Sequence, residues 1–551
     1  MEGTRRKVGG LATEGYDHRG RGVGRDSGRI PTHGVAMKIN IVGGGPAGLF
    51  FALLMKQLDP AHIVTVVERD GPHATFGWGI VFSEKTLTFL DEHDHATYAA
   101  ITRASQTWDS VVVGHPQRTV RVGGNPIAGI ARLTFLNLLH RRCQALGVDL
   151  RFHTHLTHPD DWRDCDLLVG ADGANSLVRK TYEGFFLPSI DLRQNKYLWL
   201  GATQPFDGLT MLFRRVPAGL FIAHAYQFSP THSTFIAECT PATWLRAGLG
   251  EMDEAQTCDY LGQVFAGDLH GRPLLANNFV RWLNFPLIKN KHWRHQNVVL
   301  LGDALHTAHF SIGSGTKLAL EDAIALAGAF REQGDVPNAL AAFERARQPV
   351  VERFQAAALQ SLTWLENVEA HLTLDPVPFT YRLMTRSRRV GLGRIRLADP
   401  AFADEYLAWQ RAQPQEGPIP SDFLDLFEKR SFGHLATLMP DGTPHVTSVW
   451  VDFDGQHVLI NSARGRLKDR NMQQRPNVAL QIPDPDNPDR YLAVRGPVVE
   501  ITETGADEHL DSLAPRYLGK EFYPPGMRYP GEVRCIYRIE PKHVTTWHPF
   551  G

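Results

Sequence analysis

The hydrophobic positions of the chain begin abruptly after a polar N-terminal stretch. Residues 1–36 are rich in glycine and show little apolar periodicity, so they cannot bury enough surface to order themselves. We expect a disordered tail there, or a start codon placed upstream of the true one. Apolar blocks then predict a buried strand at 38–42, a helix at 47–58 and a second strand at 63–67. This order is typical of a βαβ unit with parallel strands.

The pattern changes twice in the middle of the chain. Residues 195–240 alternate apolar and polar positions, which predicts an antiparallel sheet. From Glu321 to about Ala370 the pattern is helical. An arginine-rich stretch follows at 381–396, and the hydrophilic segment "QRAQPQEGPIP" at 410–420 predicts a linker between domains.

The last part of the chain consists of short strands separated by tight turns. A short helix is expected at about 465–474. The predicted strands are 432–438, 444–453, 457–463, 477–482, 491–502 and 534–540. Closely spaced strands of this kind indicate a small barrel.

Composition excludes several classes of function. Lys and Arg number 58 against 59 Asp and Glu, so no net field attracts nucleic acid or an anionic membrane. No apolar run approaches the length of a membrane span. The 5 cysteines are scattered without a Cys-x-x-Cys pair, which favours reduced thiols in a cytoplasmic protein over a disulfide frame or a zinc site.

A glycine motif opens the first predicted helix. "GGGPAG" follows the first strand, so Gly43 permits a tight turn, Gly45 lets the backbone approach a pyrophosphate, and Gly48 lets helix and strand pack closely. Glu68 ends the next strand, where a carboxylate can hold a ribose hydroxyl. The motif therefore predicts a dinucleotide site.

Three further segments resemble the fingerprints of FAD-dependent monooxygenases of the aromatic-hydroxylase branch. They are "GIARLTFL", "DLLVGADGANSLVR" and "VVLLGDALHTAHFSIGSGTKLALEDA". The resemblance implies FAD as the dinucleotide, with Asp303 at the ribityl chain, Asp172 and Gly173 near the pyrophosphate, and the turn at 313–315 facing the flavin ring. The residues expected to bind FAD are Gly43, Gly45, Ala47, Gly48, Glu68, Arg69, Arg132, Asp172, Gly173, Asp303, Gly313 and Gly315.

The resemblance narrows to the aryl-CoA subgroup, which includes salicylyl-CoA 5-hydroxylase and 2-aminobenzoyl-CoA monooxygenase. It spans about Met37 to Pro400 and includes "FGWGIVFSEKTLTFL" and "NKYLWLGATQPFDGLTMLF". The broader class shows Pro-x-x-Gly-x-Gly-x-Asn where this chain has Phe310 and Lys317. Lys317 is therefore not expected to take over the role of that asparagine.

Such enzymes use NAD(P)H, O₂ and FAD to hydroxylate an electron-rich ring, and the protein positions the ring and excludes water. Each candidate for the substrate site could instead be a packing aromatic or a satisfied structural group. His306 and His309 have the spacing of a metal pair, but no third ligand is apparent, so we expect no metal. The candidates are Trp78, His224, Tyr226, Gln227, His309 and Lys317.

A CoA thioester would need cations for its phosphates. The arginines of the stretch 381–396 could supply them, although a solvated basic face, or pairing with nearby acidic residues, is the simpler interpretation. These arginines are Arg382, Arg386, Arg388, Arg389, Arg394 and Arg396.

The C-terminal part resembles the split β-barrels of the pyridoxamine-phosphate oxidase superfamily. The matching words are "GHLATLMPDGTPHVTSVWVDFDG" and "NSARGRLKDRNMQQRPNVAL". In that family the strand-to-helix segment holds the phosphate of FMN or of the deazaflavin F₄₂₀. The resemblance assigns this role to Ser462, Arg464, Arg466 and Lys468, and it places Thr447, Val449 and Trp450 near the cofactor ring.

The expected fold is therefore α/β plus β: a Rossmann-type FAD domain with an inserted antiparallel substrate sheet, then a split β-barrel. The expected ranges are 1–36 for the tail, 37–400 for the monooxygenase, 401–420 for the linker and 421–551 for the barrel. The expected substrate is an aromatic acyl-CoA, or else a free or carrier-bound aromatic acid. The barrel could act as a reductase, or as a binding module without catalysis, and such barrels usually form homodimers.

Overall fold

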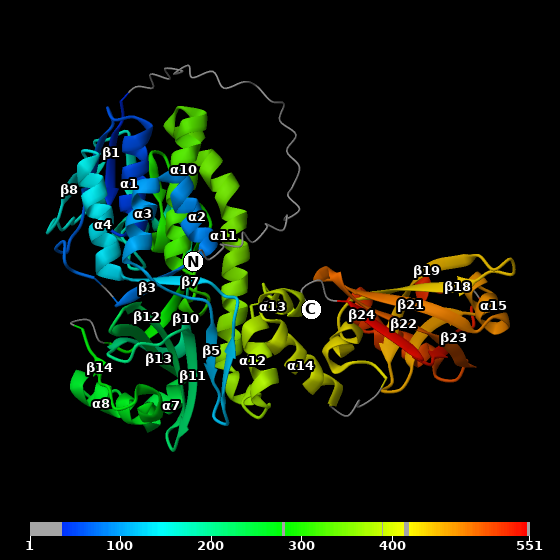
Figure 1. The fold of residues 1–551 in the computed structure, drawn as a ribbon. Coiled ribbons are helices and arrows are strands. Elements are labelled where there is room, and N and C mark those ends of the chain that lie inside the picture. The colour runs from blue at the N-terminus through cyan, green and yellow to red at the C-terminus, as the bar shows by residue number, and fades with distance from the viewer. Residues whose placement is uncertain are drawn as a thin grey trace, which may run out of the picture. The chain divides into compact units, whose positions relative to one another are not determined.

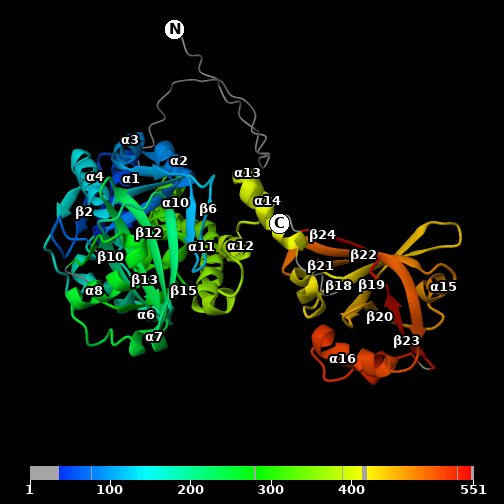
Figure 2. The same ribbon diagram turned by 60° about the horizontal axis from the view of Figure 1, so that its bottom comes forward.

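The computed structural model describes residues 36–75, 77–277, 281–387, 389–412, 418–529 and 531–547 (Figures 1 and 2). The expected N-terminal tail lies outside the described residues, except for Ala36. None of the helices in the described ranges combines the length and the apolar character that crossing a membrane requires.

The first sheet has six strands in the order β16-β17-β9-β1-β2-β8. Strand β1 pairs in parallel with both β2 and β9, and the predicted βαβ unit is confirmed. Apolar residues such as Ile39 and Ile41 are fully buried in this sheet because both of its faces are covered. The strands are β1 (Lys38–Val42), β2 (Ile63–Val67), β8 (Asp149–Arg151), β9 (Leu167–Gly170), β16 (Arg294–His295) and β17 (Val298–Leu300).

Helices cover this sheet (Figure 1). Helix α1 packs against α10, where the rings of Phe51 and Phe330 lie 6.4 Å apart. The helices of this region are α1 (Pro46–Leu58), α2 (Glu84–His93), α3 (His95–Ala104), α4 (Arg132–Ala145), α5 (Leu177–Thr181), α6 (Glu183–Phe186) and α10 (Gly315–Gln333).

The second sheet confirms the antiparallel expectation for 195–240. Its order is β14-β10-β13-β12-β11-β5-β6, and β15 pairs with β10. A three-stranded sheet, β3-β7-β4, contacts strand β12 of the second sheet. The strands are β3 (Gly79–Ser83), β4 (Gln106–Trp108), β5 (Val111–Gly114), β6 (Thr119–Val122), β7 (Ile127–Ala131), β10 (Pro188–Ala202), β11 (Leu209–Val216), β12 (Gly219–Ser229), β13 (His232–Cys239), β14 (Leu274–Leu275) and β15 (Leu283–Asn290); the helices nearby are α7 (Pro241–Arg246), α8 (Glu254–Val264) and α9 (Ala266–Leu269).

Long helices follow, as the pattern predicted, but they continue into the expected linker. Residues 401–412 form most of helix α14, because Phe402, Ala403 and Tyr406 bury an apolar face and the ring of Tyr406 stacks 3.8 Å from Tyr381. The linker expected at 401–420 is therefore helical over its first part, and 413–417 lie outside the described residues. The helices are α11 (Val336–Glu366), α12 (Pro376–Thr385), α13 (Leu392–Ala398) and α14 (Pro400–Ala412).

The C-terminal part is a closed antiparallel barrel of six strands, in the order β21-β18-β19-β20-β23-β22, closed by pairing of β21 with β22. The predicted strands are confirmed, while α16 and β24 were not foreseen. Helix α16 lies against β20 and β23 through Ala506 (Figure 2). The elements are β18 (Phe432–Leu438), β19 (Pro444–Phe453), β20 (Val458–Ala463), α15 (Leu467–Gln474), β21 (Asn477–Asp484), β22 (Asn487–Thr502), α16 (Ala506–Leu518), β23 (Arg534–Ile539) and β24 (His543–Trp547).

Candidate active site and cofactor sites

The glycine turn between β1 and α1 has two tight positions and one open position. Gly43 has φ +110°, and a Cβ there would lie 2.3 Å from the carbonyl oxygen of Ala171. A Cβ on Gly48 would lie 2.3 Å from the carbonyl oxygen of Gly43. Gly45 has no neighbour within 4 Å of such a Cβ, so its backbone faces open space. A pyrophosphate needs this combination of close strand packing and an open amide edge.

Glu68 lies at the same turn. Its Oε2 accepts a hydrogen bond from Gly44 N at 2.8 Å, and its Oε1 accepts from Asp70 N at 3.0 Å. Arg69 points instead to the surface, with Nε 3.3 Å from Asp70. Ala47 packs under the later turn, because a Cβ on Gly302 would lie 3.1 Å from its methyl group.

Asp172 orders the next turn. Its carboxylate accepts from Ser176 Oγ at 2.5 Å and from Leu177 N at 2.6 Å, so it caps the start of α5. Gly173 has φ +77° and no neighbour within 4 Å of the position that a Cβ would take. The open backbone beside Gly173 is therefore the part of this turn that a pyrophosphate could approach.

Arg179 is a residue that sequence reasoning missed. It is 2% exposed, and its Nη1 donates to the carbonyl of Ala304 at 2.8 Å. Its Nη2 donates to the carbonyl of Ala174. The side chain thereby joins the turn after β9 to the turn after β17. Its place in "GANSLVR", directly after the Asp-Gly pair, was the one available signal.

Arg132 and Asp303 place opposite charges beside these turns. The backbone N–H of Arg132 donates to Trp78 O at 2.9 Å, while its Nε atom is buried without a hydrogen-bond partner among the described residues. Asp303 is exposed and accepts no hydrogen bond from a described residue. Desolvation by the surrounding protein raises the pKa of the Asp303 carboxyl group. The positive charge of Arg132 partly offsets this rise.

These features fit FAD. Phosphate oxygens can accept from an unsatisfied guanidinium and from open backbone amides, and ribityl hydroxyls can donate to a carboxylate. Gly315, at the start of α10, also has open space where a Cβ would project. Gly313 has φ +60°, which turns the chain into that helix.

Aromatic side chains cluster beside this site. The ring of Tyr197 lies 5.0 Å from that of Phe310, and the ring of His224 meets Phe310 edge-on at 5.3 Å. His309 lies 4.9 Å from Phe285, also edge-on. Burial and the nearby Asp303 raise the pKa of Tyr197 to about 12, which places this cluster next to the expected flavin site.

A buried carboxylate lies under the cluster, and sequence reasoning did not select it. Glu238 is 1% exposed; it accepts from Asn195 Nδ2 at 2.8 Å and lies 3.1 Å from His224 Nε2. Burial alone would raise its pKa, but the hydrogen bonds with His224 and from Asn195 lower it. Burial lowers the pKa of His309 to about 3, so this ring is neutral near pH 7.

Trp78 and Tyr226 lie where the three-stranded sheet β3-β7-β4 meets the second sheet. The hydroxyl of Tyr226 donates to Gly79 O at 2.8 Å, and burial raises its pKa to about 12. The ring of Trp78 stacks with Phe228 at 6.3 Å, and its Nε1 is buried without a partner among the described residues. Gln227 is half-buried on the same strand as Tyr226.

Lys317 is part of a buried ion network. Its Nζ lies 2.5 Å from Glu321 Oε1, and Glu321 Oε2 accepts from Arg347 at 2.7 Å. Arg347 also binds Asp322, whose other oxygen lies 2.7 Å from His306 Nε2. In the described residues, no group of three His, Cys, Asp or Glu side chains has the arrangement of a metal site.

The arginines of 381–396 are not one group. Arg386 Nη2 donates to Ser311 O at 2.6 Å and its Nε to Ser361 Oγ at 2.8 Å, so it holds the loop before α10. Arg389 lies 4.1 Å above the ring of Phe354. Arg382 and Arg394 are exposed, Arg396 pairs with Asp404 at 3.8 Å, and Arg388 lies outside the described residues.

Two of the four barrel residues that we expect to bind a phosphate form ion pairs within the protein. Arg464 Nε donates to Glu503 at 2.8 Å, and Arg466 Nη2 donates to Glu532 at 2.6 Å. Ser462 Oγ is buried without a partner among the described residues. Lys468 has no ion pair within the described ranges, and burial lowers its pKa.

The residues expected near the second cofactor ring differ in their surroundings. Thr447 Oγ1 is buried and has no partner in the described part of the chain. Val449 belongs to the barrel core. The ring of Trp450 stacks on Tyr517 of α16 at 4.7 Å, so this helix fixes the orientation of the indole.

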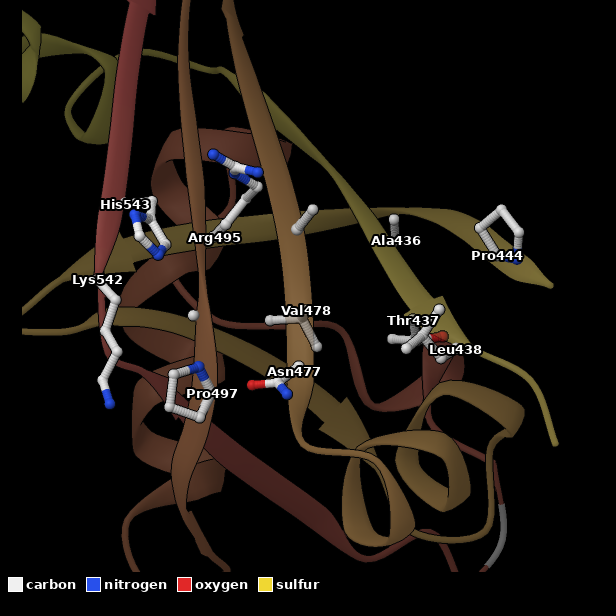
Figure 3. A pocket seen from close by; sticks show the side chains of 12 residues that line it. Ala436, Thr437, Leu438, Pro444, Asn477, Val478, Arg495, Pro497, Lys542 and His543 are labelled. Carbon is white, nitrogen blue, oxygen red and sulfur yellow. The ribbon is translucent and has the colours of Figure 1, made fainter. Parts of the chain in front are cut away.

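A groove of about 510 Å³ opens on the outside of the barrel (Figure 3). Figure 3 shows Lys542 and His543 at one end and Thr437 and Leu438 at the other, with Val478 between them. The four expected phosphate residues do not line it. Asn471 of α15 links the two regions, since its Nδ2 donates to Thr437 Oγ1 at 3.0 Å.

Both parts of the chain are similar to known protein families. Residues 36–186 match the FAD binding domain, and residues 419–548 match the pyridoxamine 5'-phosphate oxidase family. The chain is 40% identical to salicyloyl-CoA 5-hydroxylase of a Streptomyces species, over 70% of this chain and 76% of that protein. It is 34% identical to protodeoxyviolaceinate monooxygenase of Chromobacterium violaceum, over 64% of this chain and 95% of that protein.

Two further comparisons agree. The chain is 37% identical to a 3-hydroxy-4-methyl-anthranilyl-[aryl-carrier protein] 5-monooxygenase of Streptosporangium sibiricum, over 60% of this chain and 89% of that protein. The solved 2-methyl-3-hydroxypyridine-5-carboxylic acid oxygenase shares the fold, with a TM-score of 0.52 and 20% identity over 64% of this chain and 97% of that one. The chain therefore belongs to the FAD-dependent aromatic monooxygenases, and it continues into a split β-barrel of the pyridoxamine 5'-phosphate oxidase family.

Proposed function

We propose that the chain uses NAD(P)H and O₂ to hydroxylate the ring of an aromatic acyl group that is attached through a thioester to CoA. The observation that carries this proposal is the aromatic cluster around Phe310, which lies beside Asp303 and Arg132. Similarity supports the choice of substrate, because the relatives include a salicyloyl-CoA hydroxylase and an aryl-carrier-protein monooxygenase.

The chain supplies binding and orientation. Bound FAD supplies the transfer of one oxygen atom from O₂ to the ring. Arg132 would meet the negative charge of the dinucleotide, and Asp303 would accept hydrogen bonds from its hydroxyl groups. Tyr197, Phe285 and Phe310 would hold the aromatic ring flat and exclude water from it.

We also propose that the barrel holds a second cofactor, FMN or F₄₂₀. Lys468, Ser462 and Thr447 support this assignment, because an unpaired cation and two buried hydroxyls lack protein partners in the described residues. The alternative is a barrel that only binds or dimerises. The ion pairs of Arg464 and Arg466 favour that alternative, although a guanidinium has spare donors for a phosphate.

A homodimer through the barrel is part of the proposal. Val446 is 59% exposed and lies opposite Ala436 in the register of β18 and β19. Ala436 lines the groove, so apolar surface extends from the groove along the strand. Such exposed apolar surface is typical of a contact between subunits. We place the end of the monooxygenase domain after α14.

Turnover of matched substrates tests the proposal. The full chain, loaded with FAD, is incubated with NADH or NADPH and either salicyloyl-CoA, 2-aminobenzoyl-CoA or the corresponding free acids. We expect a thioester product that is heavier by one oxygen atom, with nicotinamide oxidation coupled to its formation. Hydroxylation of the free acids alone would contradict the thioester assignment.

A further inference from the structure

The carboxylate of Glu238 fixes the hydrogen bonding of His224. Glu238 is on β13 and His224 on β12, and both side chains are buried, with exposed fractions of 1% and 7%. An ionised carboxylate only accepts hydrogen bonds, so His224 donates to it from Nε2. In a neutral ring the other nitrogen, Nδ1, is then an acceptor. That Nδ1 has no hydrogen-bond partner among the described residues.

The pair lies between the aromatic cluster and a small cavity. The imidazole of His224 meets the ring of Phe310 edge-on, at 5.3 Å and 86°. On the other side, Asn195 donates to Glu238 and also lines a cavity of about 240 Å³. This volume is enough for several water molecules, since each occupies roughly 30 Å³ in the liquid.

The groups around Glu238 are compatible with its ionised form. His309 faces it from the loop before α10, but burial keeps this imidazole neutral near pH 7. The guanidinium of Arg386 and the neighbouring thiol of Cys239 both interact electrostatically with the carboxylate of Glu238. A buried carboxylate without catalytic duty would cost free energy, and apolar residues would serve the core as well.

We propose that Glu238 is a positioning residue that holds His224 in the tautomer whose Nδ1 accepts the proton lost by the substrate's ring hydroxyl or amino group. This inference rests on the proposed function. During oxygen transfer the O–H or N–H bond breaks, its electron pair moves into the ring, and its proton goes to Nδ1. The ring carbon gains one atom of O₂ as a hydroxyl group and then loses its hydrogen as a proton, which restores aromaticity, while the proton on Nδ1 returns to the substituent. The other oxygen atom leaves as water, with NAD(P)H supplying the two electrons and solvent supplying the remaining proton.

Glu238→Gln separates this role from a structural one. The glutamine amide can still accept from Asn195, but it would donate to Nε2 of His224 and move the imidazole proton to Nδ1. A ring in that tautomer cannot accept the substrate proton. With salicyloyl-CoA as the probe we expect kcat to fall at least about 100-fold with little change in KM, as for loss of a general base. His224→Gln should give a similar loss, and the double variant E238Q/H224Q should be no worse than either.

A matched control tests whether a loss of protein stability alone explains a lower kcat. Asp94 is also a buried carboxylate, paired with Arg142 far from the cluster in sequence, so Asp94→Asn should lower stability and leave kcat unchanged. The nitrogen chemical shifts of labelled His224 report its tautomer in the full-length protein without turnover. We expect Nε2–H in the wild type and Nδ1–H in E238Q.

The outcomes are distinct. Unchanged histidine shifts, or an E238Q enzyme with the wild-type kcat and pH profile, would overturn the positioning role. A wild type that hydroxylates neither thioester would overturn the proposed function and the proton-accepting role with it, while the histidine shifts would still decide whether Glu238 sets the tautomer.

Discussion

The guanidinium of Arg179 donates to the backbone carbonyl of Ala304 at 2.8 Å, across a separation of 125 residues in the chain. This bond joins the turn after β9, whose open backbone at Gly173 we assign to the pyrophosphate of FAD, to the turn after β17 that carries Asp303. The two turns at which we propose that FAD binds are therefore held together by a contact within the protein itself.

Replacing Arg179 should weaken both the fold and FAD binding. Arg179→Met removes two hydrogen bonds from a charged, buried donor, which we expect to cost about 2–4 kcal/mol of stability. The measurement is the FAD content of purified protein together with its unfolding temperature. Arg163→Met, at a half-exposed arginine bonded to Gln296, is the control and should retain FAD. Full FAD retention in R179M would contradict the assignment of these turns.

Arg386 should affect coupling more than substrate affinity. It fixes Ser311 O in the loop that would face the flavin ring, so Arg386→Met should let that loop move and let reduced cofactor react unproductively with O₂. We expect more H₂O₂ for each nicotinamide oxidised and little change in KM for salicyloyl-CoA. Arg331→Met, at the exposed end of α10 and outside the stretch 381–396, is the control. A large rise in KM without H₂O₂ release would show instead that Arg386 binds the CoA phosphates.

His309 should make the protein sensitive to acid. Its pKa is about 3 in the folded state and 6.5 for an ordinary histidine, so the unfolded chain binds an extra proton between these values. The contribution of the neutral imidazole to the free energy of unfolding is therefore complete above pH 6.5 and is lost as the pH falls toward 3. The expected loss of stability between pH 7 and pH 5 is about 2 kcal/mol. Urea unfolding of the wild type and His309→Gln over this range measures it. Identical pH dependence in the two proteins would rule out a buried neutral imidazole at this position.

The barrel site can be tested by a double variant. Arg464→Ala with Lys468→Ala removes two candidate phosphate ligands from the segment before and within α15. We expect the second cofactor to be lost while FAD is retained. Arg470→Ala is a matched control, because Arg470 is an exposed cation on the same helix. If the double variant keeps the second cofactor, the phosphate is held elsewhere, and the groove around Lys542 becomes the next candidate.

Local patterns were sufficient to predict most of the fold. Strands β1 and β2 and the strands of the barrel follow from runs of apolar and alternating residues, and the structure confirms them. Helix α16 was missed because Pro515 lies inside it, and β24 because its residues are only exposed or half-buried and form no apolar run. Helix α14 was taken for linker because the polar segment at its end obscured the apolar face of Phe402 and Tyr406.

The site was predicted less completely, for a physical reason. Motifs identify residues next to backbone turns, such as Gly43 and Gly173, because their conformation is a local property. Glu238 and Arg179 derive their importance from partners that are distant in sequence, and the one local signal is the place of Arg179 in the segment that follows Asp172 and Gly173. Asp172 was expected near a pyrophosphate, and its position in the structure shows a helix cap as well.

The most direct test of the two-site account is the identity of the cofactors that denaturation releases from the purified full chain, resolved by chromatography and mass spectrometry. The account predicts FAD together with FMN or F₄₂₀. Release of FAD alone, even after incubation with FMN and with F₄₂₀, would contradict the claim of two redox sites and leave the barrel as a binding or dimerisation module.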